Sequence, residues 1–492
     1  MGENMIYNIY EKDISNAISK LCMQGAYTLS DDVLDAYLDS YISAEDPREK
    51  YIMGELIRNS QISNEGKFPL CQDTGIAIVF VEIGLDIHIN GDLHKAINQG
   101  VRDAYADGFL RKSVLDNPLF DRKNTGDNTP ANVNIEFSNS IPSNEIRISL
   151  IQKGGGCANC SNFKAIVPSE GIEGVKDFVV ETIKNAGGKP CPPIVVNVGI
   201  DSDNAHSALN AQKASLRHIG ERNEDPKVAE LELELLEEIN KLNIGAQGFG
   251  GKATAFDVHI KQGTSHLVNL LTTVDITCNI VRHRSVIIKL SAGNQKTFYF
   301  ENNFNKSIPV FQENNQNIKE VKLPLTKRAI KNLNVGDVVS LSGEIYTARD
   351  AAHKRLLEMI EKKEKLPFNL KNATIYYVGP TPTRPDEIIG SCGPTTSIRM
   401  DAYSKVLFEN GVKGMIGKGQ REKETMNLMK KHECVYFAAI GGAAAVAAES
   451  VVSNEPVTFE DLGPEAIRKL EVKDWICTVA VDSKGNSIFE RE

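Results

Sequence analysis

A thiol, an amide, a carboxylate and a hydroxyl stand on four successive residues, 71–74, with the sequence Cys-Gln-Asp-Thr. Gly75 follows them, and the apolar run 76–83 that comes next is typical of a buried strand. The polar side chains are therefore predicted to lie in the turn that enters a core strand, which is a rigid place to hold reactive groups. A capped turn with a small buried cysteine would show the same pattern.

Two further isolated cysteines, Cys191 and Cys278, lie in comparable settings, beside an apolar strand or a basic patch. The long intervals between Cys71, Cys191 and Cys278 exclude a local zinc finger, but they allow three loops of one fold to converge on a metal. Iron–sulfur clusters usually take four thiolates. Three thiolates would leave one iron open, so that it could act as a Lewis acid on a substrate hydroxyl and carboxylate.

The pair Cys157 and Cys160 forms a C-x-x-C pattern directly after the glycines 154–156. A zinc site would need a second close pair, and a thioredoxin-like motif would need a different βα context. Packed or incidental thiols are the favoured interpretation. The glycines could let backbone N–H groups approach an anion, but the Gly-Lys-Ser/Thr of a nucleotide-binding loop does not follow them.

Four cations lie beside glycines, small residues or an expected helix end: Arg111, Arg349, Arg399 and Lys418. Bidentate pairing between arginine and carboxylate suits a small dicarboxylate ligand. Each cation taken alone could equally lie on a solvated surface. A lone histidine such as His266 is more often structural than catalytic.

The composition is that of an ordinary globular protein of 492 residues, with 41% hydrophobic and 25% charged residues. A net charge of −9 argues against a nucleic-acid partner. The start of the chain shows no signal pattern, and the longest small-apolar run, 437–448, is too short to cross a bilayer. A cytoplasmic protein is expected. Nine cysteines at irregular intervals do not suggest a disulfide framework.

The periodicity predicts an α/β protein of two domains. The larger, mixed α/β domain is expected over 1–290, an Asn-rich linker over 291–321, and a smaller α/β domain over 322–492. Helices are expected within 4–60, 93–115 and 226–242, and strands at 76–83, 133–137, 146–152, 194–200 and 255–260.

At this point the chain resembles the class I, iron–sulfur fumarate hydratases and the related tartrate dehydratases. It is similar to the two-subunit form with its α-like and β-like halves joined. The resemblance covers nearly the whole chain, and its motifs are jointly specific. In this sequence the motifs stand at 71–75, 153–156, 191–193, 245–251, 278–283, 349–353, 379–382, 390–396, 399–401 and 417–419.

The resemblance implies a role for each residue that matches these motifs. Cys71, Cys191 and Cys278 would ligate a [4Fe-4S] cluster whose fourth iron binds substrate. Thr395, assisted by Asp73, would be the base at the carbon that bears the proton, with His266 near the leaving hydroxyl. The substrate would be bound by Gln72, Arg111, Gly154, Arg349, Arg399 and Lys418.

The resemblance also implies the reaction, the reversible hydration of fumarate to (S)-malate, catalysed by a homodimer with a swivelling C-terminal domain. L-tartrate dehydration and mesaconate hydration are alternatives within the family, and a non-catalytic iron or redox sensor is an alternative of another class. Cys157 and Cys160 depart from the family pattern and could alter the redox lability of the cluster. Cys392 belongs to the pattern but not to the ligand set.

Overall fold

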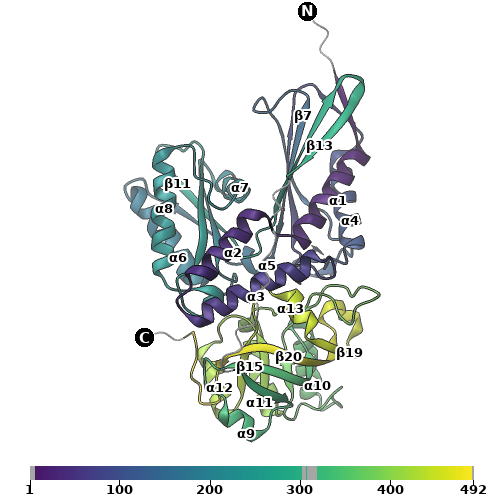
Figure 1. Cartoon of the computed structure of the whole chain (residues 1–492), viewed down its shortest axis with the longest axis vertical. Helices are drawn as coiled ribbons and strands as arrows, with labels where there is room; N and C mark the ends of the chain where they lie inside the picture. The colour runs from purple at the N-terminus through teal and green to yellow at the C-terminus, as the bar shows by residue number, and fades with distance from the viewer. Residues whose placement is uncertain (1–5, 302–305, 307–317, 490–492) are drawn as a thin grey trace, which may run out of the picture.

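The computed structural model describes residues 6–301, 306 and 318–489. Two sheets with their helices form the N-terminal region, and a third sheet forms the C-terminal region below them in Figure 1. The two-domain α/β prediction is confirmed. Among the described residues, no helix is long and apolar enough to cross a membrane.

The first sheet of the N-terminal region has the strand order β13-β12-β7-β2-β6. Helices α1 and α4 contribute to a buried core with β2, β7 and β12. Within this sheet β2 runs antiparallel to β7, with Ile76 opposite Lys153. That register puts the polar turn before β2 beside the glycines after β7. The strands are β2 (Ile76–Ile83), β6 (Asn132–Phe137), β7 (Glu145–Lys153), β12 (His283–Ser291) and β13 (Gln295–Phe300).

The second sheet has the order β10-β9-β11-β8 and packs on α6 and α8. Its strand β11 runs antiparallel to β9, with Thr277 opposite Val195. Because Cys191 precedes β9 and Cys278 follows β11, both cysteines lie at the same end of this sheet. The chain then passes directly from Cys278 into β12 of the first sheet. The strands are β8 (Asn162–Ile166), β9 (Ile194–Asp201), β10 (Ala255–Gln262) and β11 (Leu270–Thr277).

The helices of the N-terminal region lie on both sides of the two sheets, and α2 and α3 run along the boundary with the C-terminal region (Figure 1). They are α1 (Glu11–Tyr27), α2 (Asp31–Ser43), α3 (Pro47–Asn64), α4 (Leu93–Asp107), α5 (Gly155–Ala158), α6 (Gly171–Ala186), α7 (Asn204–Ala214) and α8 (Pro226–Lys241). Short elements are β1 (Tyr7–Tyr10), β3 (Ile87–Asn90), β4 (Leu115–Asp116), β5 (Lys123–Asn124), η1 (Ala246–Gly248) and η2 (Ala292–Asn294).

The C-terminal sheet has the order β14-β15-β16-β17-β18-β20-β19, and β16, β17 and β18 are parallel neighbours. Ligand sites of such sheets lie at the carboxyl ends of the strands. Those ends here lead into the segments that contain Thr395, Lys418 and Gly441. The strands are β14 (Lys319–Leu323), β15 (Val338–Thr347), β16 (Thr374–Tyr376), β17 (Gly414–Gly417), β18 (Val435–Ala438), β19 (Val451–Thr458) and β20 (Ile467–Val481).

Helices of this region cover the sheet and supply further segments to the boundary between the regions. They are α9 (Lys327–Asn332), α10 (Asp350–Glu361), α11 (Asp401–Glu409), α12 (Lys423–His432) and α13 (Ala444–Glu449), with η3 (Ser397–Met400) and η4 (Glu460–Glu465).

Three local expectations differ from the structure. The helical segment 4–60 begins with strand β1 and contains three helices. The helix expected over 93–115 ends at Asp107, and Gly108 caps it. Strand β13 lies within the expected linker 291–321, yet it pairs with β12 and so extends the first sheet to Phe300. Most of the remaining linker lies outside the described residues.

Candidate active site

The three predicted ligand cysteines converge where the ends of the two N-terminal sheets meet. Their mutual closeness shows in Tyr37, whose pKa is raised well above its ordinary value by burial and by the nearby thiols of Cys278, Cys71 and Cys191. The Tyr37 hydroxyl donates to the carbonyl oxygen of Asn279 at 3.0 Å. The wall behind the thiols is therefore formed by helix α2.

The three thiols differ in acidity because their surroundings differ. Burial raises the pKa of Cys71 to about 11. A hydrogen bond from Cys157 lowers the pKa of Cys278 to about 6, with Arg282 adding to this effect. Lys418 contacts Cys191, with Nζ 2.6 Å from Sγ. Two cations thus face sulfurs that become negatively charged when they ligate a metal.

The thiols of Cys71, Cys191 and Cys278 are the type of donor that an iron–sulfur cluster takes. All nine cysteines are free. Among the described residues, the set of three ligand-type side chains with all ligand atoms within 4.8 Å of one another is Asp32, His218 and His283, which contains no thiol. Ligands of a [4Fe-4S] cluster each bind a different iron, so their sulfurs lie farther apart than ligands of one ion. Three free thiol donors at one place fit such a cluster.

Asp73 is held by three contacts, two to its carboxylate and one to its backbone carbonyl. Its Oδ1 lies 3.1 Å from Nη2 of Arg111, and its Oδ2 accepts from the backbone N–H of Gly155 at 3.0 Å. Arg282 donates to the Asp73 carbonyl oxygen at 2.8 Å. Burial alone would raise the pKa of Asp73, but Arg111 and Arg282 keep that pKa below its usual value. Asp73 is therefore ionised at neutral pH.

Gly154 and its neighbours lie close to the carboxylate of Asp73, whereas the glycine-rich sequence suggested an approach to an anionic ligand. A Cβ on Gly154 would lie 3.2 Å from Oδ2 of Asp73. The glycines form the start of the short helix α5 instead of an open loop. The close approach of this glycine backbone therefore supports the carboxylate of Asp73.

The C-terminal region brings the other cations to the same place. Arg399 donates to the hydroxyl oxygen of Thr395 at 2.6 Å, and its Nη2 lies 3.3 Å from Asp350. Arg349 pairs with Glu465 at 2.9 Å. The pKa of Arg349 is lowered by burial and by the neighbouring charges of Arg111 and Arg399. These guanidinium groups therefore lie close enough to repel one another, as expected of a site for an anion.

Direct contacts join the two regions around the site. Arg111 donates to the carbonyl of Gly379 at 2.8 Å, and Gln72 donates to that of Pro394 at 3.3 Å. Gln247 pairs with both backbone groups of Gly441, at 2.8 and 2.9 Å. The site is thus shared by both regions, and all three predicted thiol ligands come from the first.

His266 is the one predicted residue that the structure does not bring to this group within the chain. It lies in the exposed segment between β10 and β11, and β11 separates it from Cys278. An eight-residue strand spans about 25 Å. Few residues separate His266 from Cys278 in the sequence, but they include the extended strand β11. The two residues therefore lie at opposite ends of the sheet.

Sequence reasoning did not single out several residues that line the site. Arg282 is buried and contacts Asp73, and Cys157 donates to Cys278. Asn279 donates to the carbonyls of Cys191 and Gly441. The basic residues after Cys278 were a signal for Arg282. The interpretation of Cys157 as a packed or incidental thiol is incomplete, because it touches a predicted ligand.

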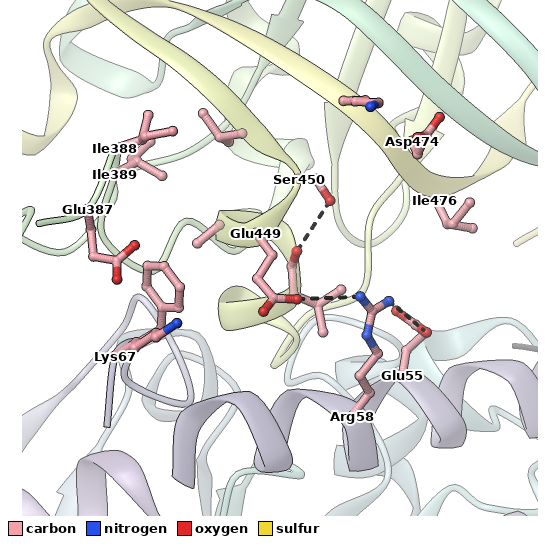
Figure 2. Close-up of a pocket in the computed structure, with 15 residues that line it drawn as sticks. Glu55, Arg58, Lys67, Glu387, Ile388, Ile389, Glu449, Ser450, Asp474 and Ile476 are labelled. Carbon is pink, nitrogen blue, oxygen red and sulfur yellow. Dashed lines mark hydrogen bonds and ion pairs between the residues drawn. The ribbon is translucent and has the colours of Figure 1, made fainter. Parts of the chain in front are cut away.

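A pocket of about 480 Å³ lies elsewhere on the boundary between the regions (Figure 2). Glu55 and Arg58 of α3 face Glu449 of α13 across it, with Arg58 3.4 Å from Glu449. None of the predicted site residues lines it. Its volume therefore does not mark the chemistry.

Comparisons with known proteins agree with this architecture. The fumarate hydratase (fumerase) family matches residues 15–287, and the fumarase C-terminus family matches residues 295–492. The anaerobic and the aerobic class I fumarate hydratases of Escherichia coli K12 are 32% and 33% identical to this chain, and each match covers 90% of this chain and 83% of the relative.

A putative L(+)-tartrate dehydratase subunit alpha of Methanocaldococcus jannaschii is 42% identical over 57% of this chain and 99% of its own length. With both family regions present in order, the chain belongs to the class I fumarate hydratase family.

Proposed function

We propose that this chain catalyses the reversible hydration of fumarate to (S)-malate, and that Cys71, Cys191 and Cys278 hold a [4Fe-4S] cluster. The observation that carries the proposal is the convergence of three thiols from the N-terminal region with Lys418 and a set of arginines. A cluster with three protein ligands supplies a Lewis acid for the substrate's hydroxyl and carboxylate when it is bound.

The cations bind and orient the dicarboxylate. Arg111, Arg349 and Arg399 repel one another less once a carboxylate lies between them, so substrate binding relieves an electrostatic cost. The planar guanidinium groups also fix the direction of each carboxylate. Gln72 lies beside Cys71, its Oε1 3.4 Å from the sulfur, and so places an amide at the boundary of cluster and substrate.

Thr395 acts as its alkoxide, which takes the proton from carbon in the malate-to-fumarate direction and so becomes the neutral hydroxyl; in hydration that hydroxyl returns the proton to carbon. A threonine hydroxyl is a weak base in water, so the alkoxide has to be stabilised. Here Arg399 lies 2.6 Å from Oγ1, which lowers the free energy of forming the alkoxide. The ionised Asp73 holds Arg111 in place and adds the negative charge that balances this cationic site.

We further propose that the chain acts as a homodimer and that His266 serves the active site of the partner subunit. The segment 263–268 is exposed throughout, and Leu267 and Val268 beside the histidine are 90% and 62% exposed. Adjacent apolar side chains on an exposed loop favour burial against a partner. Such burial would bring the ring to a second site, although it lies far from its own.

Dehydration of L-tartrate is the alternative, supported by the 42% identity to the archaeal protein. Tartrate differs from malate by one hydroxyl, which a pocket discriminates only when a polar group is left unpaired. The ratio of kcat/KM for malate to kcat/KM for L-tartrate separates the two activities. The value of kcat/KM for mesaconate tests the third activity, mesaconate hydration.

The proposal is tested on anaerobically reconstituted protein by an iron and sulfide count, a visible spectrum and a fumarate hydration assay. Four irons and four sulfides per chain are expected. Cys191→Ser should lose the cluster absorbance, whereas Cys434→Ser, a buried thiol of the C-terminal region, should keep it. A Cys191→Ser protein with an unchanged spectrum would contradict the ligand set.

A further inference from the structure

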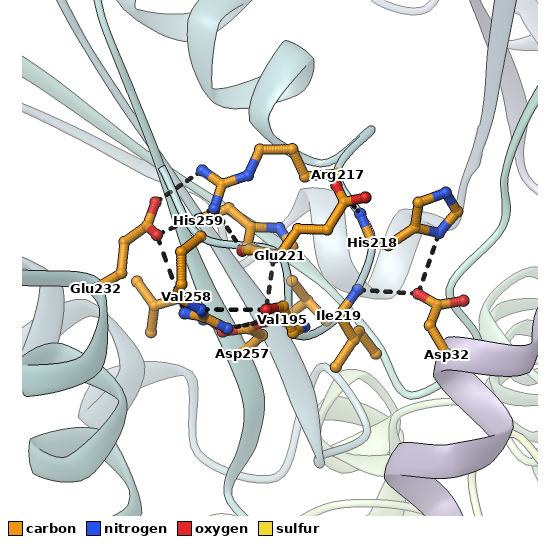
Figure 3. Close-up of polar contacts among 12 residues, drawn as sticks. Asp32, Val195, Arg217, His218, Ile219, Glu221, Glu232, Asp257, Val258 and His259 are labelled. Atoms are coloured by element: carbon orange, nitrogen blue, oxygen red, sulfur yellow. Dashed lines mark hydrogen bonds and ion pairs between the residues drawn. The ribbon is translucent and has the colours of Figure 1, made fainter. Parts of the chain in front are cut away.

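A second group of metal-ligating side chains lies outside the thiol site. His218 is in the loop after α7, Asp32 is in the first turn of α2, and His283 begins β12. The ligand atoms of the three all lie within 4.8 Å of one another. Figure 3 shows the ring of His218 facing Asp32, whose Oδ2 also accepts from the backbone N–H of Ile219 at 2.9 Å.

Two distances within this trio match the edges of a coordination polyhedron. Nδ1 of His218 lies 3.3 Å from Nε2 of His283 and 3.4 Å from Oδ2 of Asp32. A tetrahedral ion with ligands at about 2.0–2.2 Å separates those ligands by about 3.3–3.6 Å. His218 therefore already lies at the separation from each of the other two ligands that one shared ion requires, and the third pair lies within 4.8 Å.

The residues behind the trio are those that support a metal-binding histidine. Nε2 of His218 contacts Oε1 of Glu301, so the carboxylate fixes the ring with Nδ1 turned toward Asp32 and His283. Ser285 in turn donates to Oε2 of Glu301 at 3.0 Å. A carboxylate on the far ring nitrogen is the usual partner of a metal-bound imidazole, because it fixes the tautomer and raises ligand basicity.

We propose that Asp32, His218 and His283 bind a divalent transition-metal ion, with Glu301 as the positioning carboxylate. Two imidazoles and one carboxylate suit zinc or ferrous iron. The site is separate from the thiols and does not depend on the proposed function. An ion there would join α2, the loop after α7 and β12, and so fasten the helix that carries Tyr37 behind the cysteines.

The protonation states of the two histidines set the conditions for binding. Burial lowers the pKa of His283 to about 4, so its ring is neutral at pH 7 and has a free electron pair. Hydrogen bonds to Asp32 and Glu301 raise the pKa of His218 to about 10, so a proton occupies its place in the metal-free site. Arg284, also on β12, adds positive charge nearby.

The test uses full-length, anaerobically reconstituted protein, in which the thiols are occupied, and titrates it with Co²⁺ and Zn²⁺. One equivalent of ion should bind, measured by calorimetry. The Co²⁺ spectrum should lack an intense thiolate charge-transfer band. Binding should also raise the melting temperature.

Variants assign the ligands. Asp32→Asn and His218→Gln should each abolish the bound equivalent, and Glu301→Gln, which keeps all three ligand atoms, should weaken affinity about 10–100-fold. His206→Gln is the matched control, because His206 also pairs with an aspartate, Asp203, but on the exposed surface. It should bind as the unaltered protein does.

Two results would overturn the proposal. One is unaltered protein that takes up no Co²⁺ or Zn²⁺ beyond the cluster at millimolar concentrations. The other is uptake that persists in Asp32→Asn, together with an affinity in Glu301→Gln that equals that of the unaltered protein. Glu301→Gln also keeps the test decisive if His218→Gln does not fold.

Discussion

The contact between Thr395 and Arg399 determines whether a weakly acidic hydroxyl can act as a base. The guanidinium lies 2.6 Å from Oγ1 and pairs with Asp350 at the same time. Since Asp350 offsets only part of the positive charge, the arginine retains a preference for the alkoxide form of the threonine. This contact distinguishes Thr395 from threonines that only cap turns.

Substitution of Thr395 tests the proton-transfer role. Thr395→Ala should lower kcat for fumarate hydration about 10²–10⁴-fold, the usual contribution of a general base. Thr395→Ser keeps the hydroxyl beside Arg399 and should retain most of the activity. Both variants should keep the cluster spectrum, which is measured on the same samples. Full activity in Thr395→Ala would remove the assignment.

The pKa of Asp73 gives a second test at this scale. Arg111 lowers that pKa, so the carboxylate and its contacts are present above the depressed pKa and are lost as the pH falls through it. Arg111→Gln should raise the pKa of Asp73 and move the acidic limb of the kcat/KM profile to higher pH. Arg111→Lys keeps a positive charge and should move the acidic limb less. Equal limbs in both variants and the unaltered protein would show that Asp73 does not need to be ionised.

At the scale of elements, the register of the sheets accounts for what could be predicted. Cys71 and Cys191 adjoin strands that the apolar pattern predicts, β2 and β9, whereas β11, which precedes Cys278, was not among the predicted strands. The pairing of β9 with β11 then brings Cys191 and Cys278 together, a step that no local pattern contains. The same pairing sends His266 to the far end of the sheet.

Contacts that depend on three-dimensional packing could not be predicted from the sequence. Cys157 reaches Cys278 only because β7 and β2 place the glycine turn beside the thiols. The trio Asp32, His218 and His283 comes from three distant segments with no shared motif. The fold class and the ligand cysteines could be predicted from strand patterns and the family resemblance. The neighbours of those cysteines could be identified only from the structure.

The loop after β18 gives a prediction about an element. A Cβ on Gly441 would lie 2.5 Å from Sγ of Cys191 and 3.0 Å from Cδ of Lys418. Gly441→Ala should therefore displace the sulfur and cost about 1–3 kcal/mol of folding free energy, as overpacking does. We expect reduced iron per chain after reconstitution and a lower melting temperature.

The matched control for this substitution is Gly54→Ala in α3. A Cβ there has its nearest neighbour at 3.4 Å, an ordinary contact, and alanine favours the helix. Its iron content should equal that of the unaltered protein. Equal iron content in Gly441→Ala would show that the loop adapts and that Cys191 is not crowded.

At the scale of the whole molecule, the position of His266 makes the oligomer part of the proposed site. Mixing subunits tests this directly. His266→Ala and Thr395→Ala dimers should each be nearly inactive, but random exchange of their subunits should restore about a quarter of full activity, because each mixed two-fold dimer has one intact site. A mixture that stays inactive after demonstrated exchange would show that His266 does not act across the dimer.

The exposed apolar segment gives a complementary measurement. Leu267→Asp places a charge where the partner subunit is proposed to lie and should shift the dimer toward monomer in sedimentation velocity. Ile42→Asp, on the exposed face of α2, is the matched control and should sediment as the unaltered protein does. Unchanged sedimentation of Leu267→Asp would locate any dimer contact elsewhere.

The contacts of Cys191 with Lys418 and the loop at Gly441 also bear on the order in which the enzyme matures. The C-terminal half closes over a sulfur that belongs to the N-terminal half. A carrier that delivers preformed iron and sulfide needs room at that sulfur. We therefore expect delivery to precede final docking of the two halves, so that newly made chains acquire the cluster more readily than chains that have already closed.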